Sequence, residues 1–319
     1  MDCKKIFLVW LAAALVQQAW GQARIGLNGT PRVQAVQPTE RPVASPYTAE
    51  DSARYRRLIQ TAYHALQNDS FAVGKSRLEQ ALKVLPKMPS NVEVYYELGQ
   101  LEEREGRQRS ALDLYGKAIK FNGSYAKPYL RRGGLYLLLG QAADAVADFD
   151  KVLHLSPKDE DALFFRACAH ADMGHVAAAA ADFGALLALH PLDERASYGM
   201  ALLDVQQKNW QQALQRMDAL IGRHPNDSRY YAKRADIEEA LGQGAAAAAD
   251  WAHATDLSPK DAALLKGHAL FLARQGRREE ALTLLDRGQR MGVPYEDVEL
   301  LRTAVRRQKP IQKTTVGKK

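Results

Sequence analysis

Apolar and small residues follow one another along this chain at helical spacing, in pairs of runs separated by a short break. In residues 161–191 a first amphipathic run ends at Gly174, and a second run carries Ala179 and Phe183 before it stops at Pro191. Glycine can adopt the left-handed conformation that ends a helix, and proline cannot continue one. The segment is therefore predicted to form a helical hairpin.

The hairpin pattern repeats every 34 residues. Prolines recur at this interval, at Pro157, Pro191, Pro225 and Pro259. Alanines keep the same interval, at Ala111, Ala145, Ala179, Ala213, Ala247 and Ala281. The segment LSPKD occurs at 155–159 and again at 257–261, three such intervals later. One hairpin cannot bury its apolar face alone, so the repeated hairpins are predicted to stack.

These residues resemble the tetratricopeptide repeat family, which favours particular small, aromatic and proline positions in each 34-residue unit. The unit 228–261 matches the family pattern at Tyr231, Ala235, Ala247, Trp251, Ala254 and Pro259. The resemblance implies an all-α fold, a right-handed α-solenoid of stacked helix-turn-helix hairpins over residues 51–294. About seven repeats are expected, at 55–88, 92–125, 126–159, 160–193, 194–227, 228–261 and 262–294.

The segments that flank the repeats have distinct compositions. Residues 1–23 combine Lys4 and Lys5 with an eleven-residue apolar run and small residues, which is typical of a cleaved secretory signal peptide. Residues 24–50 are predicted to be a proline-rich linker. Residues 295–308 have apolar positions on one helical face and are predicted to be a capping helix, followed by a basic, disordered tail at 309–319.

The signal sequence indicates export, and no later segment is apolar enough to span a membrane. Cys3 would leave with the signal, so the mature chain would keep only Cys168 and could form no intramolecular disulfide. A bacterial periplasm or another part of the cell envelope is favoured over a eukaryotic secretory route.

No pattern of catalytic, cofactor-binding or metal-binding residues stands out. His170 and His175 flank Asp172, but their spacing of five residues and the intervening Gly174 place them off a common helical face. Cys168 lacks neighbours that would indicate a reactive thiolate, and a small buried side chain is the favoured interpretation. The chain is therefore not expected to be an enzyme or to hold a cofactor.

Charged residues at two positions of the unit vary together. The seventh position is arginine in the three units where the twenty-third is aspartate: Arg132 with Asp148, Arg166 with Asp182, and Arg234 with Asp250. Our hypothesis is a salt bridge between the two helices of each of these hairpins. The alternative is that each charge is separately solvated.

The family resemblance also implies where a ligand would bind, because first helices line the concave groove of tetratricopeptide solenoids. The candidate groove residues are Tyr96, Leu130, Phe164, Phe165, Tyr198 and Leu202. An extended or helical segment of a protein partner is expected to pack against them. The alternative is that these side chains only pack between neighbouring hairpins.

The expected function is thus a non-catalytic interaction scaffold of the cell envelope that binds a protein or peptide of unknown identity. One alternative is an accessory factor of an outer-membrane or glycan assembly or export machine. Nucleic-acid binding is the weaker alternative: the formal net charge is +7, but six basic residues without an acid fall in residues 306–319, and export argues against such a ligand.

Overall fold

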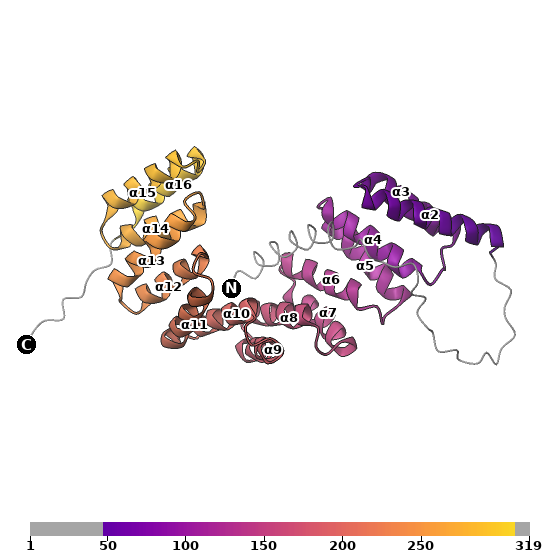
Figure 1. The fold of residues 1–319 in the computed structure, drawn as a ribbon, viewed down its shortest axis with the longest axis horizontal. Helices are drawn as coiled ribbons and strands as arrows, with labels where there is room; N and C mark the ends of the chain where they lie inside the picture. The colour runs from indigo at the N-terminus through magenta and orange to yellow at the C-terminus, as the bar shows by residue number, and fades with distance from the viewer. Residues whose placement is uncertain (1–46, 310–319) are drawn as a thin grey trace, which may run out of the picture. The chain divides into compact units, whose positions relative to one another are not determined.

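A computed structural model describes residues 47–309 of the chain (Figure 1). The predicted signal peptide 1–23, the linker up to residue 46 and residues 310–319 of the predicted tail lie outside the described residues. The secondary structure of residues 47–309 is entirely helical. Its helices are α2 (Ala49–Gln67), α3 (Phe71–Val84), α4 (Asn91–Arg104), α5 (Gln108–Phe121), α6 (Ala126–Leu138), α7 (Ala142–Leu155), α8 (Glu160–Asp172), α9 (Val176–Leu189), α10 (Glu194–Gln206), α11 (Trp210–Arg223), α12 (Ser228–Ala240), α13 (Gly244–Leu257), α14 (Ala262–Arg274), α15 (Arg278–Arg290) and α16 (Tyr295–Arg307).

Consecutive helices pair into hairpins, beginning with α2 and α3 and ending with α14 and α15. The described residues divide into two compact units, which belong to residues 1–182 and 183–319, with the boundary inside α9. Within each unit the second helix of a hairpin also packs against the first helix of the next, as α5 does on α6 and α11 on α12. The predicted all-α fold of stacked helical hairpins is confirmed.

The first helix begins earlier than the repeat pattern predicted. α2 starts at Ala49, six residues before Tyr55 and within the last two residues of the segment predicted as linker. The side-chain oxygen of Thr48 accepts a hydrogen bond from the Asp51 backbone at 3.0 Å, and the Asp51 carboxylate accepts one from the Thr48 backbone at 2.9 Å. This reciprocal capping box satisfies backbone donors at the helix end and fixes where α2 begins.

The break between the two helices of a hairpin requires a left-handed residue. Five of these breaks place a glycine at φ between +75° and +79°: Gly106, Gly140, Gly174, Gly242 and Gly276. In the hairpin α10–α11 the same position is Lys208, at φ +61°. The conformation is therefore imposed by the hairpin geometry and is kept where the sequence lacks glycine.

The hairpin core joins small residues to aromatic rings. The alanines at the 34-residue interval, from Ala111 to Ala281, are completely buried. Four glycines, Gly99, Gly133, Gly199 and Gly267, face aromatic rings at close range; a Cβ on Gly99, for example, would lie 2.5 Å from the Tyr115 ring. The absence of a side chain there lets the two helices approach closely.

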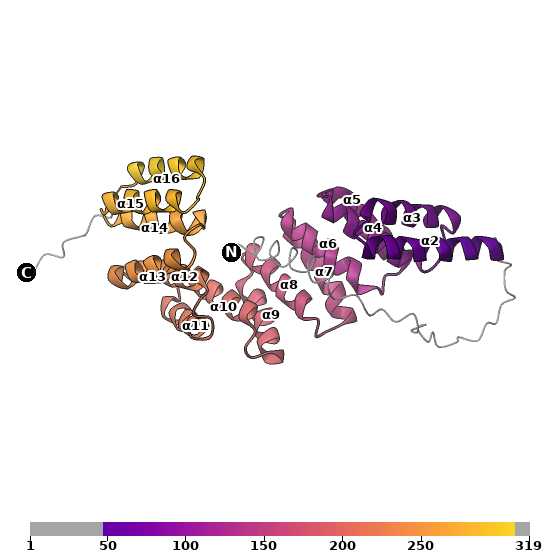
Figure 2. The same cartoon turned by 45° about the horizontal axis from the view of Figure 1, so that its top comes forward.

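The helix α16 packs against both α14 and α15 (Figure 2). Its buried residues are Val298, Leu301 and Val305, which join a core cluster that also contains Leu272 and Leu285. This apolar face covers the side of the hairpin α14–α15 that a further repeat would otherwise cover.

Candidate binding face on the first helices

All six predicted groove residues lie on first helices: Tyr96 on α4, Leu130 on α6, Phe164 and Phe165 on α8, and Tyr198 and Leu202 on α10. Their burial differs. Leu130, Tyr198 and Leu202 are half-buried and keep exposed surface, whereas Tyr96 is 6% exposed.

Phe164 and Phe165 are both buried, unlike Leu130, Tyr198 and Leu202. Each phenylalanine is 1% exposed. Their ring centroids lie 5.3 Å apart, and the Phe165 ring stacks on Phe149 of α7 at 6.0 Å. These contacts are of the kind that the packing alternative expects, and partner binding at the two residues stays a prediction.

The first-helix face of residues 1–182 carries tyrosines together with acids. We define the tyrosine cluster as Tyr63 on α2, Tyr96 on α4 and Tyr125 at the start of α6. The rings of Tyr96 and Tyr125 meet edge to face at 5.8 Å. Glu97, the residue after Tyr96, is half-buried, and its carboxylate has no hydrogen-bond or ion-pair partner within residues 47–309.

The electrostatics of these side chains show that they share one environment. Burial raises the pKa of Glu97 to about 7; the charge of Lys127 opposes this shift and that of Glu93 adds to it. Burial, and then the charges of Glu93 and Glu97, raise the pKa of Tyr125 to about 12. The pKa of Tyr63 is raised by burial and by the same two carboxylates. Repeat spacing did not predict this grouping, because Tyr63 and Tyr125 occupy different positions of their units.

The first-helix face of residues 183–319 carries a tyrosine among charged groups of both signs. Tyr198 lies 5.5 Å from Tyr230, measured between ring centroids. Burial raises the pKa of Tyr198; the positive charges of Lys233 and Arg229 oppose the shift, and the carboxylates of Asp227 and Asp236 add to it. Both signs of charge thus surround Tyr198, whereas the tyrosine cluster lies mainly among acids.

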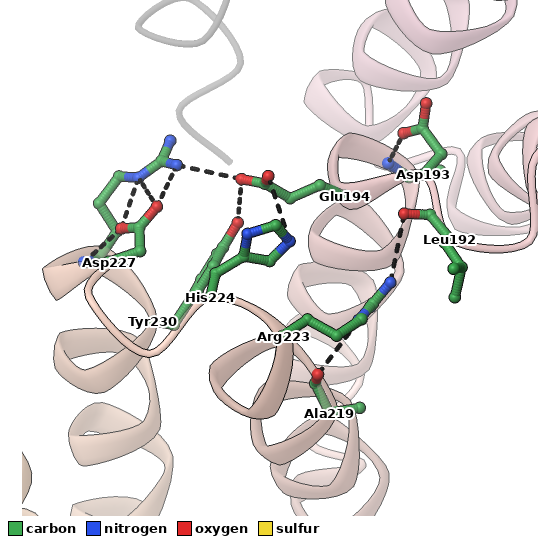
Figure 3. Close-up of polar contacts among 10 residues, drawn as sticks. Leu192, Asp193, Glu194, Ala219, Arg223, His224, Asp227 and Tyr230 are labelled. Atoms are coloured by element: carbon green, nitrogen blue, oxygen red, sulfur yellow. Dashed lines mark hydrogen bonds and ion pairs between the residues drawn. The ribbon is translucent and has the colours of Figure 1, made fainter.

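A polar network joins the start of α10 to the start of α12 (Figure 3). The Tyr230 hydroxyl donates to the Glu194 carboxylate, and the Arg229 guanidinium lies 3.3 Å from the same carboxylate. His224 Nε2 lies 3.5 Å from Glu194, and Arg229 Nε donates to Asp227 at 2.9 Å. Burial and the hydrogen bond to Glu194 both raise the pKa of Tyr230. The network fixes the spacing of two successive first helices.

The structure brings together all three predicted Arg–Asp pairs. In each pair the guanidinium donates through two nitrogens to both carboxylate oxygens, over distances of 2.6–2.8 Å: Arg132 to Asp148, Arg166 to Asp182, and Arg234 to Asp250. Each pair joins the two helices of one hairpin. The aspartates are buried and the arginines keep about a quarter or less of their side-chain surface exposed.

Two of these arginines also reach the preceding hairpin, which the sequence analysis did not anticipate. Arg166 contacts Asp150 at 2.6 Å, and Arg234 contacts Asp218 at 2.7 Å. Arg302 of α16 contacts Asp286 of α15 in the same way. Arg302 follows Arg234 by two repeat intervals. The 34-residue interval therefore identifies α16 as the first helix of an incomplete eighth hairpin.

A further buried ion pair escaped the sequence analysis. Arg131 of α6 is 5% exposed, and its Nη2 lies 3.0 Å from the carboxylate of Glu103 on α4. The Tyr115 hydroxyl donates to the same carboxylate at 2.7 Å. The pair joins two hairpins, and none of the other units has arginine at the position of Arg131, so no repeated pattern marked it.

His170 and Cys168 lie on α8, and His175 directly precedes α9. The two imidazole rings lie 5.8 Å apart, centroid to centroid, and Cys168 is buried. Within the part of the chain that the structure describes, no group of three or more His, Cys, Asp or Glu side chains could hold a metal ion. None of the helices described is long and apolar enough to cross a bilayer.

Comparison of sequences and structures places the chain among helical repeat proteins. Profiles of the tetratricopeptide repeat match residues 59–127, 126–159 and 170–237, which together are more than half of the chain. An 85-residue stretch is 33% identical to a UDP-N-acetylglucosamine–peptide N-acetylglucosaminyltransferase of Giardia intestinalis. That stretch is 27% of this chain and 6% of the enzyme, so the chain spans only a small part of this relative.

Solved structures share the fold at low sequence identity. A tetratricopeptide repeat protein of Parabacteroides merdae superposes with a TM-score of 0.67 at 24% identity, over 80% of this chain and 99% of that one. PilF of Pseudomonas aeruginosa gives 0.55 at 18% identity, over 70% and 99%. PilW, described as a type IV pilus biogenesis factor, gives 0.56 at 17% identity, over 66% and 97%. With its 34-residue interval, its left-handed hairpin breaks and its buried small-residue positions, this chain belongs to the tetratricopeptide repeat family.

Proposed function

We propose that this protein is a non-catalytic interaction scaffold of the cell envelope, and that its first helices bind a segment of a protein partner. The observation that carries the proposal is the character of the first-helix face. It keeps large, partly exposed side chains at Leu130, Tyr198 and Leu202 in otherwise well-packed hairpins. Large apolar and aromatic groups with exposed surface are what an extended or helical partner segment packs against.

The charges beside these residues favour a polypeptide over a uniformly charged ligand. Acids accompany the tyrosine cluster, whereas Tyr198 lies among both signs of charge, Arg229 and Lys233 with Asp227 and Asp236. Nucleic acid presents negative charge along its whole length and would be repelled at Glu93 and Glu97. A protein segment can carry both signs of charge and match each face separately.

The location in the cell envelope rests on the signal-like residues 1–23. PilF and PilW, which share the fold, make an accessory role in an envelope assembly machine the second candidate, although the low identity carries no partner over to this chain. The short match to the Giardia transferase does not favour catalysis, because residues 47–309 consist of helical hairpins and their cap.

Partner capture with surface variants tests the proposal. The double variant Leu130→Ser/Leu202→Ser changes first helices, and Val73→Ser is the matched control on the second helix α3, where Val73 is half exposed. Lys266→Glu on α14 changes an exposed first-helix charge without removing buried surface. Helicity and the melting temperature are measured first, by circular dichroism.

We expect folded first-helix variants to lose partners that the wild type and Val73→Ser retain. Retention of every partner by folded Leu130→Ser/Leu202→Ser and by Lys266→Glu would move the binding site away from the first helices. A separate fractionation of the producing cells tests the envelope location, which a cytoplasmic, uncleaved chain would contradict.

A further inference from the structure

Glu97 differs from the three buried aspartates that pair with arginines in the hairpins. Asp148, Asp182 and Asp250 each accept two hydrogen bonds from an arginine. The Glu97 carboxylate has no such partner among residues 47–309. Partial removal of a carboxylate from water without a compensating cation or donor is unfavourable. The ionised Glu97 side chain would therefore be stabilised by a cation from outside the fold.

Tyrosines from three successive hairpins interact electrostatically with this carboxylate. Tyr63 comes from α2, Tyr96 from α4 and Tyr125 from the start of α6. The Tyr96 and Tyr125 rings are 5.8 Å apart at an interplanar angle of 76°, so they present differently oriented surfaces. Ring faces attract cations through the π-electron density, and most strongly where water is partly excluded.

We propose that Glu97 and the tyrosine cluster form a subsite for a cationic side chain, lysine or arginine, of the bound partner segment. The inference rests on the proposed function and adds the chemistry of one contact. A primary ammonium or guanidinium group would pair with the Glu97 carboxylate while its aliphatic stem packs against the rings.

The surrounding charges agree with this ligand class. Glu93, also on α4, adds negative potential at the subsite, which would repel an anionic ligand. Lys127 lowers that potential only in part: it is exposed and makes no ion pair with Glu97. A purely apolar ligand would dry the carboxylate further without pairing it, so the unpaired carboxylate favours a cation over an alkyl group.

Proton linkage gives the subsite a measurable signature. Burial holds the pKa of Glu97 at about 7, so near neutral pH a share of the molecules carries a neutral carboxylic acid. A cation binds the ionised form preferentially and must therefore displace the proton. Its affinity should fall about tenfold for each pH unit below the pKa of Glu97 and become constant above it.

The test is carboxyl carbon NMR on the full chain labelled with ¹³Cδ-glutamate, with the Glu97 signal assigned from Glu97→Gln. The probe is n-butylammonium chloride, a mimic of the lysine side chain, and 1-butanol is the neutral control at the same concentration. We expect a titration midpoint near pH 7 without the probe and a midpoint about one pH unit lower with it. Butanol should leave the midpoint unchanged.

Three variants make the result specific. Glu97→Gln keeps the size of the side chain and should abolish the response of the tyrosine ring signals to butylammonium. Tyr125→Leu should weaken that response several-fold, and Glu79→Gln, at an exposed acid on α3, should leave it intact. Each variant is accepted only if its circular dichroism matches that of the wild type.

Three outcomes would overturn the inference. One is a Glu97 midpoint that butylammonium does not move, and another is a shift that butanol reproduces. The third is a low midpoint in the full chain that rises only when residues 310–319 are removed, because the basic tail would then be the occupant. None of them depends on partner capture by the Leu130→Ser/Leu202→Ser variant, so this inference and the proposed function fail separately.

Discussion

Arg166 and Arg234 each bind two aspartates that come from different hairpins. Arg234 makes two hydrogen bonds to Asp250 of its own hairpin and contacts Asp218 of the preceding one. The Asp250 side chain is 10% exposed, whereas that of Asp218 is 54% exposed. The contact within the hairpin is therefore shielded from water, and the contact between hairpins is screened.

A double-mutant cycle with Arg234→Leu and Asp250→Leu should give a coupling of about 1–3 kcal/mol, between the values of exposed and buried pairs. The measurement is urea unfolding followed by circular dichroism. The exposed pair Arg287–Asp256, with side chains 55% and 57% exposed, is the matched control. Its coupling should stay below about 1 kcal/mol. A coupling of zero for Arg234 and Asp250 would mean that the two charges are independently solvated.

Glu238 should make stability depend on pH. Glu238 is 8% exposed, and its Oε2 has no hydrogen-bond partner in the part of the chain described. Burial, together with the charge of Asp250, raises the pKa of Glu238 to about 7. A carboxyl group that holds its proton more tightly when folded stabilises the fold at low pH. That stability is lost as the pH rises from about 4.3 through about 7.

Glu238→Gln should therefore raise the free energy of unfolding by about 1–3 kcal/mol at pH 8 and have little effect at pH 4. Urea unfolding of wild type and variant at the two pH values measures the difference, with Glu79→Gln as the exposed control. An equal effect of Glu238→Gln at both pH values would show that the carboxyl group titrates normally.

Residue correlations predicted part of this chemistry and could not predict the rest. The Arg–Asp pairs were visible because the same two positions changed together in three units. The exposed fraction of Phe164 could not be predicted from the sequence, because an aromatic side chain on a first helix can point toward the groove or toward the next hairpin. Glu97 and the tyrosines come together because successive hairpins pack side by side, and residue spacing along the chain does not predict which side chains this packing brings together.

At the scale of helices, the break between the two helices of a hairpin requires one residue in the left-handed conformation. Lys208 takes φ +61° where the corresponding position of five other hairpins is glycine. A side chain in this conformation brings Cβ close to the carbonyl oxygen and costs about 1–2 kcal/mol. The hairpin α10–α11 therefore stores strain that its neighbours avoid.

Lys208→Gly should stabilise the protein by about 0.5–1 kcal/mol, because relief of strain exceeds the extra entropy of the unfolded glycine. The melting temperature and urea midpoint measure the gain. Gly242→Ala, at φ +75° with open space around the added Cβ, is the reciprocal control and should destabilise by a similar amount. A Lys208→Gly variant less stable than the wild type would contradict this explanation.

Helix limits followed from the sequence where a glycine or proline marked them. The start of α2 did not, because the repeat register began at Tyr55. Thr48 and Asp51 form a capping box, which the repeat pattern does not include. Local capping chemistry lengthened the first helix beyond the repeat, so the 34-residue interval alone misplaces the beginning of the array.

At the scale of the whole molecule, stability in a repeat array comes from interfaces between neighbours and from covered ends. The helix α16 supplies Val298, Leu301 and Val305 to the core of the last hairpin. Its Arg302 repeats the contact that Arg166 and Arg234 make with a preceding hairpin. The cap is therefore built as the first half of another repeat.

Truncation after Pro294 removes α16 and should loosen α14 and α15, because burial of each of the three aliphatic side chains contributes about 1.5–3 kcal/mol. Hydrogen–deuterium exchange with mass spectrometry should show faster exchange in α14 and α15 while α2–α7 stays protected. Truncation after Lys309, which leaves every described helix in place, is the control. Unchanged protection of α14 and α15 without α16 would show that the last hairpin needs no cap.

Site-specific photocrosslinking tests the central claim most directly, that a partner polypeptide binds to the first helices. A photoreactive phenylalanine analogue replaces Leu130 on α6 or Tyr198 on α10, and, as controls, Val73 on α3 or Gln215 on α11. Crosslinking is done in the producing cells, and adducts are identified by mass spectrometry. The account predicts the same polypeptide adduct at Leu130 and Tyr198 and none at the second-helix positions. Adducts confined to Val73 and Gln215 would contradict it.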